Sequence, residues 1–500
     1  MVSQAIKNYF SVMDLRQRQT NNIALIIFWS QFSAFALNTI LILFLTRPLL
    51  NHGLGFSQAK AYAFIGITQA TSYLIPVFGG LMADQILGLR RSILLGTILL
   101  ACTYLFVMLS GYTLSSYGDR LFIAAYAMIP AANSLLMGTS SGMVSHIYSN
   151  DAVKAKSALT LYYMVVNIGA LVATLVAPAL MNSRFGPLSV LTVAFIGKSL
   201  AALNFAKRYS LYDNVIMGKD KEGMSKKSIL QLIAYITTIY IFTLVAYSYV
   251  NLANIMISVG CVIGILWFFI KTWALTGLKR TKQMIAILLI IEAVFFFVIY
   301  NQMNSTLVLF AKYNSDLQLL GFTISPAHYQ ILNPLLIIAL GMQLPRFYRK
   351  FPRFSIPYQF SAGTALAGAA LLMLAFAAEQ SSNGLINGNF IGLAYVFITL
   401  AELWVSAVGL SMIGLYCDSS GVAFAMGVWY LASSLSNTIS GRLGAFVAIP
   451  NNITSPVETL PLYQQYYFVM GCVALGLGLI MLFIAWGVKV RLGKKGVVLN

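Results

Sequence analysis

Long apolar segments recur from one end of this chain to the other, and no other feature limits its possible fold as much. Fourteen segments are long enough to cross a bilayer, which takes about 20 mostly apolar residues. They cover residues 21–46, 59–84, 90–111, 119–147, 157–181, 185–207, 227–248, 252–275, 284–312, 325–348, 355–378, 388–416, 422–449 and 463–490. Only 9% of the residues are charged, whereas soluble domains contain about a quarter. We therefore predict an all-α membrane protein with 14 transmembrane helices.

The net charge of +19 would suit nucleic-acid binding, but the positions of the basic residues indicate a membrane topology instead. Of the 32 Lys and Arg residues, 24 lie in segments on the same side as the N-terminus and five on the other side. Cytoplasmic loops carry this excess of positive charge. The pattern predicts that both termini are cytoplasmic, with anionic membrane lipid as a partner of the basic segments.

Six spans precede the most polar internal stretch, two follow it, and six more complete the chain. We expect an N-terminal six-helix bundle over 1–207, a linker with two additional transmembrane helices over 208–283, and a C-terminal six-helix bundle with a cytoplasmic tail over 284–500. Large transporters commonly consist of two such halves. The cysteines and histidines have no metal-binding spacing, and no phosphate-binding loop or hydrolase motif stands out. We expect no metal, no cofactor and no enzymatic activity.

The first span contains "FWSQFSAFALNTILILFL", residues 28–45, which holds several neutral polar residues and no charge. Two acidic residues lie well inside later spans. Glu402 lies near the middle of 388–416, where a charged carboxyl is costly unless it is paired or faces water, so we predict a functional role for it. Glu292 lies closer to the end of its span, and we expect it to reach the interface or to pair with a basic residue.

Four amides, Asn167, Asn301, Gln302 and Asn333, lie in the middle of further spans. Each could bridge two helices, or all four could line a polar cavity with the central carboxyl, and the residues alone leave both alternatives open. Trp429 and Ser433 are four residues apart and share a helix face, which suits a pocket wall or ordinary packing.

The loop between the second and third spans has a recognisable pattern, "GGLMADQILGLRRSILLG", at residues 79–96. Its paired glycines permit close helix approach. We expect Asp84 to cap a helix or to pair with Arg90 or Arg91. The spacing is a version of the loop signature of the major facilitator superfamily, where its role is gating. The residues assigned to gating are Gly80, Asp84, Gly88, Arg90 and Arg91.

Taken in order, several segments make the chain resemble the bacterial proton-dependent oligopeptide transporter family. They are "GGLMADQILGLRR", "YYMVVNIGAL", "YNQMNSTLVLFAKYN", "YQILNPLLII", "AELWVSAVGLS" and "MGVWYLASSLSN". The resemblance covers nearly the whole chain. It implies the major facilitator fold, with two extra helices between two six-helix halves, and a multi-pass protein of the bacterial inner membrane.

The resemblance also explains what the first span lacks. The family's first helix carries E-x-x-E-R-F-x-Y-Y-G followed by another Arg, its fourth helix carries a Lys, and its seventh carries a Glu. At these positions the present sequence has Ile27, Ser30, Gln31, Asn38, Met137 and Asn301. Charged partners tend to be lost together, because a charge left unpaired in a low dielectric is costly. The pattern therefore indicates a changed site.

In the family, the first-helix Arg and fourth-helix Lys bind the carboxylate of a peptide, and the tenth-helix Glu binds its amino end. The resemblance thus implies that Glu402 keeps the amine-binding role, and we assign proton coupling to Glu402 as well. The predicted substrate-binding residues are Gln31, Asn38, Met137, Asn167, Asn301, Asn333, Glu402, Trp429 and Ser433.

These features predict a monomeric inner-membrane secondary transporter that moves a small organic solute by alternating access, with or without protons. Its substrate would need no free carboxylate. Two alternatives stay open. One is an ordinary di- and tripeptide–proton symporter with a rearranged site, and the other is a membrane receptor that binds without transporting.

Overall fold

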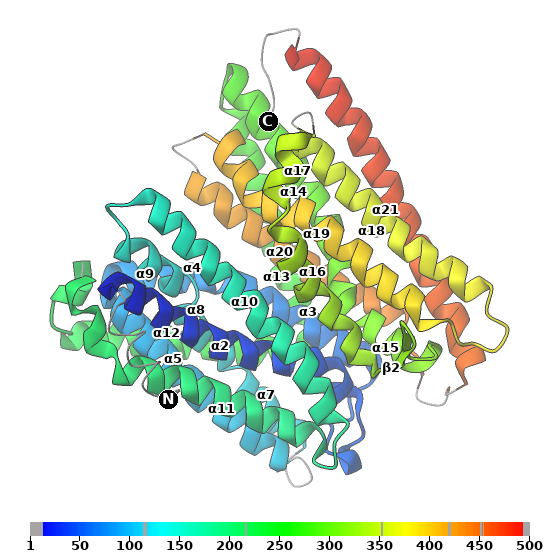
Figure 1. The fold of residues 1–500 in the computed structure, drawn as a ribbon, viewed down its shortest axis with the longest axis horizontal. Helices are drawn as coiled ribbons and strands as arrows, with labels where there is room; N and C mark the ends of the chain where they lie inside the picture. Colours follow the sequence, from blue (N-terminus) through cyan, green and yellow to red (C-terminus); the bar gives the residue numbers. More distant parts are fainter. Residues whose placement is uncertain are drawn as a thin grey trace. The chain divides into compact units, whose positions relative to one another are not determined.

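The computed structural model describes residues 14–113, 118–215, 218–351, 354–418, 422–450, 453 and 455–493. Helices make up nearly all of it (Figure 1). The α-helices are α2 (Leu15–Thr46), α3 (Gln58–Leu74), α4 (Pro76–Met82), α5 (Leu89–Tyr112), α7 (Asp119–Tyr126), α8 (Ile129–Leu136), α9 (Thr139–Ile147), α10 (Ala152–Met181), α11 (Gly186–Lys207), α12 (Lys226–Ser248), α13 (Val250–Trp273), α14 (Gly277–Tyr300), α15 (Thr306–Asn314), α16 (Leu332–Gly341), α17 (Leu344–Lys350), α18 (Ile356–Glu379), α19 (Gly388–Tyr416), α20 (Val422–Phe446) and α21 (Pro456–Gly493).

Shorter elements connect these helices. They are the 3-10 helices η1 (Leu49–Asn51), η3 (Tyr209–Val215), η4 (Gly218–Lys221), η5 (Asn301–Asn304) and η6 (Pro326–Ile331), the π-helix η2 (Ala83–Leu87), and the strands β1 (Gln318–Leu319) and β2 (Phe322–Thr323). The two strands form a small antiparallel hairpin, with Gln318 opposite Thr323.

The helices agree with the predicted membrane spans. Among the described residues, 12 helices are long and apolar enough to cross a bilayer. The predicted span 422–449 corresponds to α20, in which six polar residues between Ser433 and Ser440 are all buried. The predicted span 325–348 is divided into η6, α16 and α17. The fourteen predicted spans are therefore consistent with the helices that form.

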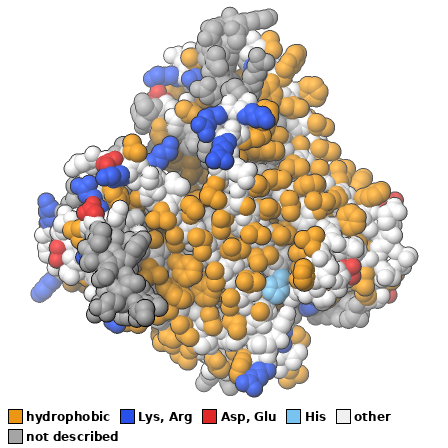
Figure 2. Space-filling view, in the orientation of Figure 1, with side chains coloured by type: hydrophobic (Ala, Val, Ile, Leu, Met, Phe, Trp, Pro, Cys, Tyr) orange, Lys and Arg blue, Asp and Glu red, His pale blue; other side chains and the backbone are white. Residues whose placement is uncertain are grey.

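The surface matches a lipid environment. Figure 2 shows hydrophobic side chains over most of the visible face, with Lys and Arg side chains gathered in a few groups. Many large apolar side chains are exposed, including Phe242 and Ile263 on α12 and α13. Exposed apolar patches of this extent are unusual on soluble monomers and indicate contact with acyl chains.

Several spans are interrupted. The second span breaks before Pro76, and the fourth breaks twice, before Pro130 and at Gly138. The span 284–312 is interrupted by η5 at Asn301–Asn304. Proline ends helical hydrogen bonding because it has no N–H, and discontinuous helices often form the binding sites of transporters.

The chain forms two compact units. The first comprises residues 1–40, 49–54 and 75–248, and the second comprises 41–48, 55–74 and 249–500. In the second unit α18 and α21 lie side by side (Figure 1), and a Cβ on Gly368 would come within 2.6 Å of the Leu475 nitrogen. Small residues allow such close approach between membrane helices.

The two extra helices between the six-helix groups are the most exposed of the long helices. Only 17% and 22% of the apolar windows of α12 and α13 are buried, compared with 72% for Gly277–Asn304. The helix α12 belongs to the first unit, where Thr243 donates to the Ala127 carbonyl, and α13 belongs to the second, where Asn254 donates to the Ala63 carbonyl. The expected division at residues 207 and 283 remains a prediction.

Candidate functional site

A carboxyl group in the second unit has a close amide partner. Glu402 lies in the middle of α19, and its Oε2 accepts a hydrogen bond from Asn333 Nδ2 at 2.6 Å. Asn333 is the second residue of α16 and lies 3.2 Å from the Thr399 hydroxyl, one turn before Glu402. Pro334 follows Asn333 and cannot donate to the carbonyl of the preceding turn. The structure thus brings two of the predicted residues together.

Aromatic hydroxyls lie near the same carboxyl. The hydroxyl of Tyr300, the last residue of α14, lies near the Glu402 carboxyl. Tyr73, on α3, lies near enough to Glu402 to interact with it electrostatically. Asn301 begins the η5 interruption directly after Tyr300, and its Nδ2 is buried without a hydrogen-bond partner among the described residues. A buried donor without a partner is costly, so an acceptor from outside the described residues would stabilise it.

The arrangement suits a cationic or hydrogen-bonding group. Glu402 is partly exposed, and no ion pair between described residues includes it. A carboxylate at the centre of a membrane helix is stabilised by pairing with a cation or by protonation. An ammonium group from solution could provide the first of these, and a proton the second.

Trp429 and Ser433 lie deeper in the second unit. Trp429 is only 4% exposed, and its ring packs edge-on against Phe297 at a centroid distance of 5.8 Å. Ser433 donates to the Trp429 carbonyl at 3.2 Å, within α20. Gly409 leaves the space that the indole ring occupies. These contacts favour packing, and a role of either residue in substrate binding remains a prediction.

The expectation for Glu292 was wrong. Its side chain is 1% exposed, so it does not reach the interface, and no ion pair between described residues includes it. Both carboxyl oxygens are buried without a well-formed hydrogen bond, although the Thr364 hydroxyl on α18 lies nearby. The position of Glu292 near one end of the span did not indicate that its side of α14 faces other helices.

In the first unit, the polar residues of the first span fall into two groups. Ser30 and Ser33 are buried, and Ser33 donates to the Trp29 carbonyl. Gln31 and Asn38, seven residues apart and therefore on one helix face, are partly exposed. Among the described residues no hydrogen-bond partner is found for either of these two amides. A role of either amide in substrate binding remains a prediction.

Ser30 has a partner that the sequence analysis did not assign to it. The Lys198 ammonium, on α11, donates to the carbonyl and to the hydroxyl of Ser30, both at 2.8 Å. Lys198 is 2% exposed and lies 5.0 Å from the centre of the Tyr104 ring. Its position inside an apolar span was the one available signal, because an intramembrane cation is costly unless it has partners.

Met137 and Asn167 differ in accessibility. Met137 is 42% exposed and directly follows the last residue of α8, and Gly138 comes next with a φ of 77°. Asn167 is 8% exposed, and its Nδ2 donates to the Tyr163 carbonyl within α10. Of the nine predicted binding residues, four lie in the first unit (Gln31, Asn38, Met137 and Asn167) and five in the second.

The predicted gating loop folds differently from the expectation. Asp84 is exposed and does not pair with either neighbouring arginine. Arg90 is buried, forms an ion pair with Asp213 and stacks on the Tyr209 ring at 3.7 Å. Asp213 comes from the long segment after α11, so spacing within the loop could not reveal the pair.

A second acid from that segment caps α5. Asp220 Oδ2 accepts from the Arg90 backbone N–H at 2.9 Å, and Oδ1 accepts from the Arg91 N–H at 3.3 Å. Gly88 has a φ of 83°, and a Cβ there would come within 2.3 Å of the Asp220 side chain. A carboxylate at a helix N-terminus satisfies free N–H groups and the helix dipole. In the sequence, the indication of this contact was the presence of an acid, Asp220, within a strongly basic segment.

The two glycines at the start of the loop are not equivalent. A Cβ on Gly79 would come within 2.1 Å of the Ser134 carbonyl oxygen on α8, whereas one on Gly80 would meet nothing within 4 Å. The close helix approach therefore depends on Gly79. The gating role of Gly80 remains a prediction.

No group of three or more His, Cys, Asp or Glu residues suitable for a metal ion occurs among the described residues.

A family model described as the POT family matches residues 90–461. The chain belongs to the POT family. A dipeptide and tripeptide permease B of Photorhabdus asymbiotica is 31% identical over 463 residues, which cover 91% of this chain and 92% of the relative. A dipeptide and tripeptide permease A of Chromobacterium violaceum is 29% identical over 472 residues, with 94% and 93% covered.

Solved structures of the POT family have the same fold. A tetrameric PepTSo2 crystal structure matches with a TM-score of 0.83 and 26% identity, covering 96% of this chain and all of the other. A bacterial homologue of the human drug peptide transporters PepT1 and PepT2 matches with a TM-score of 0.81, also at 26% identity. The major facilitator fold and the multi-pass inner-membrane location are thereby established for this POT-family chain.

These POT-family relatives bear on three further expectations. They are named as permeases or transporters, which agrees with a protein that is not an enzyme. The tetrameric structure shows that a monomer is not a rule for this fold, so the monomeric state remains a prediction. The cytoplasmic location of both termini likewise remains a prediction.

Proposed function

We propose that this POT-family chain is a secondary transporter that moves a small peptide-like solute across the inner membrane by alternating access. Glu402 binds the ammonium or another hydrogen-bonding group of that solute. The observation that carries the proposal is the hydrogen bond between a partly exposed Glu402 carboxyl, in the middle of α19, and the Asn333 amide at the start of α16. The unpartnered Asn301 amide supports a polar group on the same solute.

The solute needs no free carboxylate for binding. Gln31, Asn38 and Met137 are all neutral and accessible, and none of them can form the charge-assisted bond that anchors a carboxylate. Amide donors can still bind carbonyl or amide oxygens of a peptide-like solute. A blocked peptide or another amine therefore fits the proposal as well as a free dipeptide does.

A binding assay with three related ligands tests this proposal. The purified full chain is titrated in a thermal-shift assay with a dipeptide, the same dipeptide as its C-terminal amide, and the N-acetylated dipeptide. We expect the dipeptide and its amide to raise the melting temperature alike, because a ligand stabilises only the state that binds it. The affinity for the acetylated form should be lower by a factor of about ten or more, which corresponds to a loss of about 1.4 kcal/mol or more of binding free energy.

Glu402→Gln provides the site control. We expect the variant to lose the response to all amines, while Glu458→Gln, which changes an exposed acid at the start of α21, should retain it. Equal binding of the acetylated peptide to the unmodified chain, or full binding by Glu402→Gln, would refute the proposed role of Glu402.

An ordinary di- and tripeptide–proton symporter is the second candidate. It is supported by the names of relatives that match more than nine-tenths of this chain. It predicts strong uptake of labelled dipeptide at micromolar concentrations and poor recognition of the amide, the opposite of the order above. A non-transporting receptor would bind ligand but show no counterflow in proteoliposomes.

A further inference from the structure

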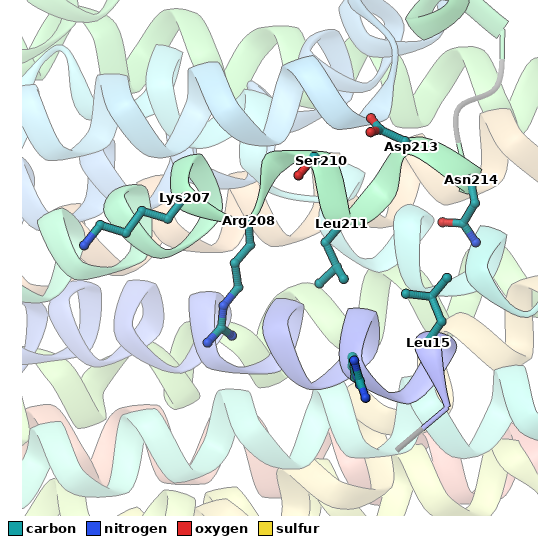
Figure 3. Close-up of a pocket in the computed structure, with 8 residues that line it drawn as sticks. Leu15, Lys207, Arg208, Ser210, Leu211, Asp213 and Asn214 are labelled. Carbon is teal, nitrogen blue, oxygen red and sulfur yellow. The ribbon is translucent and has the colours of Figure 1, made fainter. Parts of the chain in front are cut away.

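A basic pocket lies in the first unit, apart from the residues discussed for the solute. It has a volume of about 680 Å³ and lies between the first turns of α2 and the junction of α11 with η3 (Figure 3). Its lining residues are Leu15, Arg18, Lys207, Arg208, Ser210, Leu211, Asp213 and Asn214.

Among the described residues, no acid neutralises the positive charge of this pocket. Three cations line it, and the single acid, Asp213, forms its ion pair with Arg90. Figure 3 shows Asp213 directed away from α2, whereas Arg208 points toward it. The pocket therefore presents a surplus of positive charge to any occupant.

Two arginines are arranged to hold an anion. Arg208 donates from one guanidinium nitrogen to Asn22 Oδ1 at 3.1 Å, which fixes the side chain and leaves other N–H groups free. The Arg18 Nε is buried and has no hydrogen-bond partner among the described residues. A buried, unpaired guanidinium donor is costly, and phosphate oxygens satisfy arginine in a two-pronged geometry.

An apolar strip leads to the pocket. Ile196, Leu200 and Leu203 are exposed on α11, and Lys207 follows at the end of the same helix face. Leu15, at the mouth of the pocket, is also exposed. A soluble phosphate ion would not cover these apolar side chains. The acyl chain of a lipid would cover it while the headgroup enters the pocket.

We propose that this pocket binds the phosphate headgroup of an anionic phospholipid, with its acyl chains along the exposed face of α11. Arg18 and Arg208 hold the phosphodiester, and Lys207 supplies further positive charge from the edge. Basic pockets beside membrane helices bind anionic headgroups in this way. Because η3 also holds Arg90 through Asp213, a bound lipid would stabilise the loop before α5.

Native mass spectrometry of the purified full chain tests the proposal with dioleoyl phosphatidylglycerol and, as the zwitterionic comparison, dioleoyl phosphatidylcholine. We expect phosphatidylglycerol to bind about tenfold more tightly, and Arg18→Gln with Lys207→Gln to remove that preference. The matched control is Arg120→Gln with Arg184→Gln, which removes two exposed cations from the same unit and should preserve the preference. An unchanged preference in the pocket variant of a folded protein would overturn the proposal.

Two additional measurements are needed. The first distinguishes a lipid phosphate from a soluble phosphate, and the second tests the site in the unmodified chain, in case the variant does not fold. Inorganic phosphate and glycerol 3-phosphate, tested as competitors, should not displace the lipid, and equal binding of either one would show a soluble-phosphate site instead. In the unmodified chain, a photoreactive phosphatidylglycerol should label residues within 15–25 or 196–214. Labelling confined to other segments would contradict a lipid site in this pocket.

Discussion

At the scale of single residues, the contact with Lys198 explains why the first span contains a buried polar residue, Ser30. The Lys198 ammonium has two acceptors on Ser30, and both groups are buried. We expect Ser30→Ala to remove one acceptor and to destabilise the protein by about 1.5–3 kcal/mol, as for other bonds to charged groups. Adding Lys198→Met should recover part of that loss, because the buried cation that has lost an acceptor is removed as well.

Melting temperatures of the single and double variants form a cycle that checks this prediction. Ser361→Ala is the matched control, because Ser361 is equally buried but donates only to the Pro357 carbonyl within its own helix. Its loss should be smaller. Strictly additive effects of Ser30→Ala and Lys198→Met would mean that the contact has no energetic importance.

At the scale of helices, α3 and α20 meet in the second unit through glycine. A Cβ on Gly441 would lie 2.8 Å from the Tyr62 carbonyl oxygen and 3.0 Å from the Gly66 Cα, so backbone would have to move. We expect Gly441→Ala to cost about 1–3 kcal/mol, as overpacking does, and to lower the melting temperature. Gly427→Ala, on the same helix but with nothing within 4 Å, should have no such effect.

The helix α5 depends on a cap from another segment. Asp220→Ala removes the acceptor for the Arg90 and Arg91 N–H groups, and we expect a loss of about 1 kcal/mol, measured as a lower melting temperature. Glu222→Ala is the control, since that acid pairs only with Lys219 on an exposed surface, where ion pairs contribute little. A similar loss in both variants would show that Asp220 acts through general charge and not as a cap.

At the scale of the whole molecule, the number of titrating groups limits the coupling of transport to protons. Ile27, Ser30 and Asn301 cannot titrate, which leaves Glu402, with Glu292 as a second acid inside the spans. A proton moved down one pH unit supplies about 1.4 kcal/mol, or about one log unit of accumulation. We expect the accumulation ratio of the true substrate to rise by at most about one log unit per pH unit.

Steady-state uptake in proteoliposomes at several imposed pH gradients measures this slope. A slope of about two or more would require a second coupled proton, and Glu292 would then be the first residue to substitute. A slope near zero would indicate facilitated diffusion.

The sequence by itself determined the class of the protein, the position of nearly every helix and the family. Apolar spans about as long as a bilayer is thick can fold only as membrane helices, because their backbone groups must be satisfied within each span. It also indicated polar roles for Glu402 and Asn333, because a carboxyl in the middle of a span and an amide before a proline are costly in a membrane helix unless they have partners.

Only the tertiary structure decided which polar groups meet. Lys198 is 168 residues from Ser30, Asp220 is 130 residues from Arg90, and Glu292 is buried by helices from elsewhere in the chain. The expected Asp84 pairing was wrong for the same reason, because the acids that hold the loop come from after α11. Spacing along a helix reveals its faces, but which face another segment covers depends on packing between distant parts of the chain.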